Sequence, residues 1–200
     1  MPPIRLLAFC TAAAAVLASA AAFAADPLPA PLLALHQRAI DDGECQSLPL
    51  LLANYKPTIA QLSATDTLYV LPCDFGVINA PSRVYVISTG PQAGVRAVLF
   101  GAFDQDFGWL GDDVLFNVAF DPQTRTLTAH EFFDPAGDCG YDGTWVWRDY
   151  AFAMVTYRFQ GTCDHTQRYP SWPLIWQAPN SAAAPRPQVG PLPDFFQAPN

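Results

Sequence analysis

The strongest structural signal in this chain is the run Gly137-Asp138-Cys139-Gly140-Tyr141-Asp142-Gly143-Thr144-Trp145-Val146-Trp147. Its glycines permit backbone conformations that a Cβ atom forbids, so we expect a tight loop that leads into a strand. Residues 144–148 and 151–159 predict two strands joined by a tight turn at Asp149-Tyr150. In such a hairpin, the numbers of paired residues sum to about 299.

The predicted hairpin also brings two cysteines together. The numbers of Cys139 and Cys163 sum to 302, close to the hairpin value, so their backbones should lie near each other. We therefore predict the disulfide Cys139–Cys163 and, from the remaining pair, Cys45–Cys73. Each closes a loop of about 25 to 30 residues, which stabilises the fold by about 3 kcal/mol in the chain-entropy account. A metal site is the alternative, but no Cys-x-x-Cys spacing exists and no metal is expected.

Four of the five tryptophans gather around this hairpin. Trp145 and Trp147 share one face of the predicted strand, and Trp172 and Trp176 follow within a short distance along the chain. Two interpretations stay open. The four side chains form either an aromatic core beneath a disulfide or an exposed surface that binds a protein, a peptide or a glycan.

Short runs rich in Val, Phe, Tyr and Leu predict further strands. They cover residues 68–71, 83–88, 95–100, 114–120, 125–133 and 174–176. Turn signals such as Ala80-Pro81 and Asp121-Pro122 separate them, and connections of hairpin length favour antiparallel pairing. Within residues 114–120, apolar side chains alternate as in a half-buried strand.

Helices are expected before the strands. Apolar residues at helical spacing predict a helix over residues 32–42, with Gly43 as its stop, and residues 50–55 predict a second short one. The expected fold class is therefore mainly β (α+β). It comprises an antiparallel sheet built from hairpins, a short N-terminal helix and two disulfides.

The first residues have the pattern of an export signal. Arg5 is the only charge before Asp26, an apolar run spans residues 6–18, and Ala22-Phe23-Ala24 has the small-x-small form that a signal peptidase needs. The alternative is an uncleaved membrane anchor, for which the run is short. Cleavage would remove Cys10 and leave an even number of cysteines, as is typical of an oxidising compartment.

These signals predict how the chain is organised. A signal peptide covers residues 1–24, and a lead-in with a helix covers residues 25–44. A disulfide-bonded β-rich domain covers residues 45–177, and a Pro-rich flexible tail covers residues 178–200. We expect a periplasmic or secreted protein with no transmembrane segment after cleavage.

The charge balance excludes one class of partner. The chain holds 10 basic and 18 acidic residues, a net charge of −8 that becomes −9 once Arg5 is removed. Lys56 is the only lysine. Nucleic-acid binding needs a basic surface, so no nucleic-acid partner is expected.

Catalytic and cofactor motifs are absent from the sequence. The chain has neither a G-x-S-x-G elbow, nor H-E-x-x-H, nor a glycine-rich phosphate loop, and no cofactor is expected. The alternative function is a periplasmic hydrolase that uses His130 or His165 together with a neighbouring carboxylate. Asp104 and Asp106 begin like a calcium loop, but the later ligand positions fail, so a solvated acidic loop is favoured.

The order of these signals resembles a known family. The sequence Gly-Asp-Cys139-Gly, Trp145-Val-Trp147, Cys163 and Trp172-Pro-x-x-Trp176 is similar to an uncharacterised family of proteobacterial periplasmic proteins, domain of unknown function 1176. Residues 68–73 and 120–127 also resemble its pattern. The resemblance implies the compartment and the fold and brings no established activity. From the absent catalytic motifs, the disulfide-bonded β-rich body and the tryptophan cluster, we expect an exported, non-catalytic binding or envelope-associated module.

Overall fold

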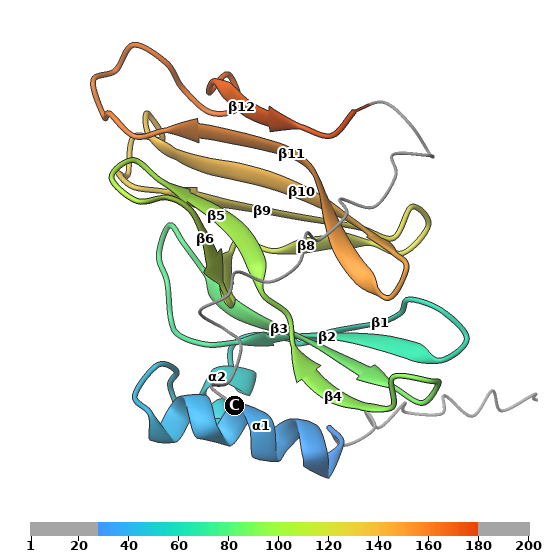
Figure 1. Cartoon of the computed structure of the whole chain (residues 1–200). Helices are drawn as coiled ribbons and strands as arrows, with labels where there is room; N and C mark the ends of the chain where they lie inside the picture. The colour runs from blue at the N-terminus through green and yellow to red at the C-terminus, as the bar shows by residue number, and fades with distance from the viewer. Residues whose placement is uncertain (1–27, 180–200) are drawn as a thin grey trace, which may run out of the picture.

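The computed structural model describes residues 28–179, which form three layers. A helix covers one face of a first sheet, and a second sheet packs on the other face (Figure 1). The strands of the first sheet are β1 (Thr58–Gln61), β2 (Asp66–Pro72), β3 (Pro81–Ser88), β4 (Gly94–Ala97) and β7 (Val114–Phe116). Those of the second are β8 (Ala119–Asp121), β9 (Thr126–Phe132), β10 (Gly140–Arg148), β11 (Ala151–Gln160) and β12 (Leu174–Gln177).

All strand pairs are antiparallel, which confirms the predicted mainly β fold class. The first sheet runs in the order β1-β2-β3-β4 with β7 also on β3, and the second in the order β12-β11-β10-β9-β8. One apolar core lies between the two sheets, and its members include Leu68, Val84, Leu127 and Trp145.

The N-terminal helix is confirmed, and a second short helix follows it. α1 (Ala30–Asp41) has a proline in its first turn and ends just before Gly43, whose φ of 79° suits glycine. Its buried residues Leu32, His36 and Ala39 face the first sheet. α2 (Leu48–Leu52) covers β2. Neither described helix combines the length and apolarity that crossing a membrane requires.

The central hairpin has the predicted turn and register. Asp149 and Tyr150 both have positive φ, 50° and 65°, as a two-residue type I′ turn requires. Arg148 pairs with Ala151, and Trp147 pairs with Phe152, at the expected sum. A bulge lies between Thr144 and Trp145. In the part of the hairpin beyond this bulge, away from the turn, the register is shifted by one residue.

Both predicted disulfides are confirmed. Cys139–Cys163 joins the start of β10 to the loop after β11, with a Cα–Cα distance of 4.8 Å. Cys45–Cys73 joins the loop after α1 to the end of β2, with a Cα–Cα distance of 4.6 Å. The hairpin register explains the first pair, because it sets Gly140 opposite Gln160.

The single strand predicted over residues 114–120 is wrong. The chain leaves the first sheet after β7 and joins the second at β8, with the break at Asn117, whose φ is 49°. The Asn117 side-chain amide stabilises this crossing, because it donates to the His130 carbonyl at 3.0 Å and accepts from the Ala80 N–H at 3.0 Å. Apolar alternation continued through the break, so the pattern gave no sign of it.

A second hairpin stands where an acidic loop was expected. β5 (Phe100–Asp104) and β6 (Gly108–Asp112) pair with each other alone. The Asp104 carboxylate closes the turn by accepting the N–H groups of Asp106 and Phe107 at 2.8 and 2.9 Å, and Gly108 adopts a φ of 79°. The predicted signal peptide and, from residue 180 onward, the predicted tail lie outside the described residues.

Candidate functional site

The structure divides the four tryptophans between core and surface. Trp145, Trp147 and Trp172 are buried, with exposed fractions of 1%, 3% and 0%. Trp176 on β12 is 43% exposed and contacts Trp109 of β6, their ring centroids 6.4 Å apart. The aromatic-core interpretation therefore describes the first three, and only Trp176 is available to a ligand.

The histidines do not form a complete catalytic group. The His165 ring contacts the buried Asp138 carboxylate through Nδ1, while Arg168 Nε lies 3.2 Å from the other oxygen. His130 lies opposite Asp142 in the sheet and stacks on Tyr169. Among residues 28–179, no serine or threonine hydroxyl is hydrogen-bonded to either ring, so neither histidine has a positioned nucleophile.

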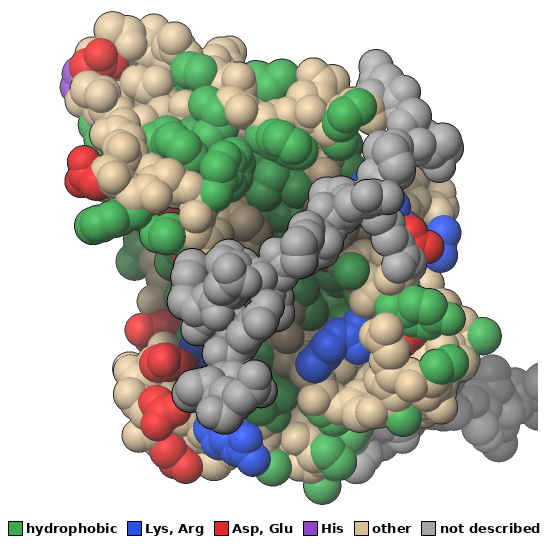
Figure 2. Space-filling view, in the orientation of Figure 1, with side chains coloured by type: hydrophobic (Ala, Val, Ile, Leu, Met, Phe, Trp, Pro, Cys, Tyr) green, Lys and Arg blue, Asp and Glu red, His purple; other side chains and the backbone are tan. Residues whose placement is uncertain are grey.

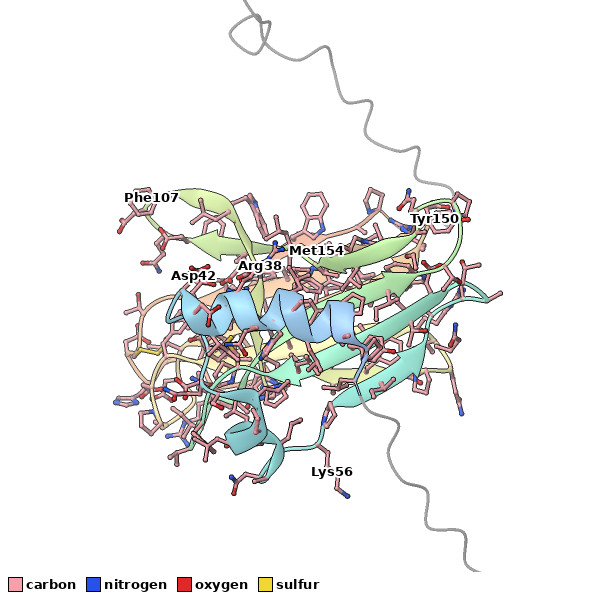
Figure 3. The ribbon with its side chains drawn as sticks, turned by 90° about the horizontal axis from the view of Figure 1, so that it is seen from below. Arg38, Asp42, Lys56, Phe107, Tyr150 and Met154 are labelled. Carbon is pink, nitrogen blue, oxygen red and sulfur yellow. A yellow bond between two sulfur atoms is a disulfide. The ribbon has the colours of Figure 1, made fainter. Side chains whose placement is uncertain are left out.

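The β5–β6 hairpin packs against one face of the second sheet. Trp109 lies edge-on to Tyr157 at 5.2 Å, and Phe103 lies edge-on to Phe159 at 5.2 Å. The Phe103 N–H donates to the Tyr157 hydroxyl at 3.3 Å. Figure 2 shows hydrophobic side chains gathered over this part of the molecule. In Figure 3, Phe107 marks the tip of the hairpin, and Tyr150 marks the turn at the opposite end of the sheet.

A pocket of about 340 Å³ lies away from this hairpin, beside Phe132 and Tyr169. Its charged lining group is Arg168, which is already paired with Asp138. A group whose charge is satisfied within the protein has little left for a ligand. The candidate site therefore lies in a second cavity.

That second cavity, which we call the acidic pocket, has a volume of about 200 Å³ and lies between the β5–β6 hairpin and the sheet. Its lining residues are Ala102, Phe103, Asp104, Leu110, Gly111, Asp112, Glu131, Phe133, Tyr141 and Tyr157. Three carboxylates and four aromatic rings thus share one small space. On the side of the pocket formed by the second sheet, strand pairing positions these residues, because Glu131 of β9 lies directly opposite Tyr141 of β10.

Glu131 is the unusual member of the acidic pocket. Burial and then the nearby charge of Asp112 raise the pKa of the Glu131 carboxyl to about 7. None of the ion pairs among residues 28–179 involves Glu131, Asp104 or Asp112. Asp112 accepts the Val114 N–H at 2.9 Å, whereas no described side chain or backbone N–H donates to the Glu131 carboxylate. Its charge is therefore unmatched within the described chain.

The two tyrosines form the aromatic wall. Tyr141 and Tyr157 stack with centroids 5.5 Å apart and planes 12° from parallel. Burial is the main cause that raises the pKa of both phenols, with a further contribution from the Glu131 charge. Both rings are therefore neutral at physiological pH, and with exposed fractions of 7% and 1% they are almost fully buried.

Sequence reasoning missed this pocket. The sequence places Asp104 in a stretch expected to be a solvated acidic loop, and it sets Glu131 beside His130 without any sign of a pocket. The available signal was an acidic residue within a strand whose neighbours are apolar. That signal does not reveal that β5–β6 folds back onto β9, β10 and β11.

These features define a disulfide-bonded antiparallel β protein with an acidic, aromatic-walled pocket beneath a separate hairpin. Residues 7–179 match the sequence profile described as "Protein of unknown function (DUF1176)", and the chain belongs to that family. The match confirms the resemblance and extends it well beyond the segment that carried it. No curated protein and no solved structure matches the chain.

Proposed function

We propose that this chain is an exported, non-catalytic binding module of the periplasm whose ligand occupies the acidic pocket. The observation that carries this proposal is Glu131, a partly buried carboxylate with no ion-pair or hydrogen-bond partner among residues 28–179. Proteins seldom retain such a group unless it serves a site, because desolvating a charge without a partner costs free energy. The cavity around it combines aromatic and apolar side chains with a few polar groups, as binding sites usually do.

The signal-like residues 1–24 and the two disulfides support export, since disulfides persist in oxidising compartments. Cell fractionation of the full chain tests this part. We expect a periplasmic species with oxidised cysteines whose N-terminus lies after Ala24. A full-length cytoplasmic species with free thiols would contradict export.

A pocket-filling substitution tests the binding role. Ala102 lines the acidic pocket and Ala119 lies exposed on β8, so Ala102→Phe fills the cavity and Ala119→Phe is the matched control. The mature protein is screened by thermal shift against small cationic, neutral and anionic compounds. We expect a midpoint rise of at least a few degrees for the wild type and the control, and none for Ala102→Phe.

If no compound stabilises the wild type, or if both variants respond alike, the binding role of the acidic pocket is wrong. The control also separates loss of binding from loss of folding, because an unfolded Ala102→Phe variant shows no transition at all. In that case, Gly111→Val on the paired strand β6, which also lines the pocket, replaces it.

A further inference from the structure

The walls of the acidic pocket select a ligand by charge. Asp104, Asp112 and Glu131 line it, and its lining includes no lysine or arginine. An anion there would meet like charge, and a neutral ligand would cover the Glu131 carboxylate without pairing it. A cation alone both enters favourably and supplies the missing partner.

The remaining wall selects among cations. Of the four aromatic residues that line the pocket, Phe133 is exposed and Phe103 is partly exposed, and aromatic rings attract organic cations through the ring quadrupole. A divalent metal ion instead prefers six or more oxygen ligands. Asp104 and Asp112 each already commit one carboxylate oxygen to backbone N–H groups, so the pocket offers few free oxygens for a metal.

We propose that the acidic pocket binds a small organic ammonium ion, with the cationic group beside the Glu131 carboxylate. This inference rests on the proposed function and names its ligand class. The volume of about 200 Å³ suits an ammonium group with a few carbons attached. The exposed apolar side chains of Leu110 and Phe133 line the same pocket and can contact the rest of such a ligand.

The field of the whole protein favours the same class. The net charge is −8 for the full chain and −9 without Arg5. A strongly negative protein raises the local concentration of cations and speeds their association, and salt weakens both effects.

The titratable groups around the pocket make binding depend on pH. They are Asp104 of β5, Asp112 of β6, Glu131 of β9, Tyr141 of β10 and Tyr157 of β11. Burial and the charge of Asp112 raise the pKa of Glu131 to about 7. Because the ammonium ion pairs with the ionised carboxylate, affinity should rise with pH through that value.

Calorimetric titration of the mature protein with choline tests the inference. The matched control ligand is 3,3-dimethylbutanol, which has the same shape without the charge, and acetate and Ca²⁺ serve as further probes. We expect choline to bind, to bind about tenfold more tightly at about pH 8 than at about pH 6, and to exclude the neutral isostere. Methylammonium in a parallel titration distinguishes hydrogen bonding to the carboxylates from contact with the rings, and binding of either cation supports the inference.

Two variants locate the effect. Glu131→Gln should weaken choline binding at least tenfold and abolish its pH dependence, while Asp106→Asn, an exposed charge at the hairpin tip, should leave both unchanged. Asp112→Asn removes the like charge beside Glu131 and should move the pH midpoint of binding downward. This third variant keeps the inference testable if Glu131→Gln does not fold.

The outcomes separate the two proposals. Binding of 3,3-dimethylbutanol or acetate in the pocket with no response to either ammonium ion would overturn the cation class and leave the binding role standing. Tighter binding of Ca²⁺ than of choline would likewise overturn the organic class. Failure of every probe would overturn both proposals. Choline presented on phosphatidylcholine vesicles, compared with free choline, shows whether the ammonium ion comes from a lipid headgroup or from a free solute.

Discussion

Burial governs the chemistry of single side chains in this protein, and His36 is a clear case. Its side chain is fully buried on α1, and its Nδ1 lies 2.9 Å from the Tyr85 hydroxyl. Burial and then the charge of Arg83 lower the pKa of His36 to about 4. Burial instead raises the pKa of the Glu131 carboxyl. The cause is the same, because burial disfavours the charged form, which is the protonated form of a histidine and the deprotonated form of an acid.

The low pKa of His36 predicts a stability slope in mild acid. Between pH 6.5 and about pH 4 the unfolded chain binds a proton at this residue and the folded chain does not. The free energy of unfolding therefore falls as the pH falls through this window, by roughly 3 kcal/mol in all. In His36→Phe this part of the slope should vanish, as measured by urea unfolding at several pH values. An identical slope in wild type and variant would show that His36 is not its source.

At the scale of elements, the β9–β10 pairing holds the acidic pocket in shape. Gly140 opens β10 with a φ of 148°, and a Cβ atom there would lie only 1.9 Å from the Glu131 carbonyl oxygen. This close approach sets the register that places Tyr141 beside Glu131. A glycine was expected to matter in this loop, but its contact with Glu131 could not be read from the sequence.

Gly140→Ala should therefore destabilise the protein by about 3 kcal/mol or more, because the backbone of β9 must move. Gly111→Ala is the matched control, since its added methyl group meets nothing within 4 Å. It should change the unfolding free energy by less than about 1 kcal/mol. Chemical denaturation compares the two variants, and equal effects would refute the close-approach argument.

Local elements were predictable, and pairings between distant elements were not. The β10–β11 turn, its register and both disulfides follow from residues near one another in sequence or from a single arithmetic relation. The break at Asn117 and the β5–β6 hairpin depend on side-chain hydrogen bonds and on packing partners far along the chain. The acidic pocket joins residues from five strands, so no single stretch of sequence contains its signal.

At the scale of the whole molecule, the three layers leave one hairpin free of either sheet. The β5–β6 hairpin pairs with neither five-stranded sheet and is fixed by aromatic contacts such as that of Trp109 with Tyr157. The acidic pocket beneath it contains the carboxylates of Asp104, Asp112 and Glu131, which form no ion pair with the rest of the described chain. This arrangement links the acidic composition of the chain to a particular place in the fold.

The most direct test of this account is the pKa of the Glu131 carboxyl, followed by NMR with and without saturating choline. The free protein should give a value near 7, because burial and Asp112 both raise it. Choline should lower that value by more than about one pH unit, since a bound cation favours the ionised carboxylate. A pKa of Glu131 that stays the same at saturating choline would contradict the account.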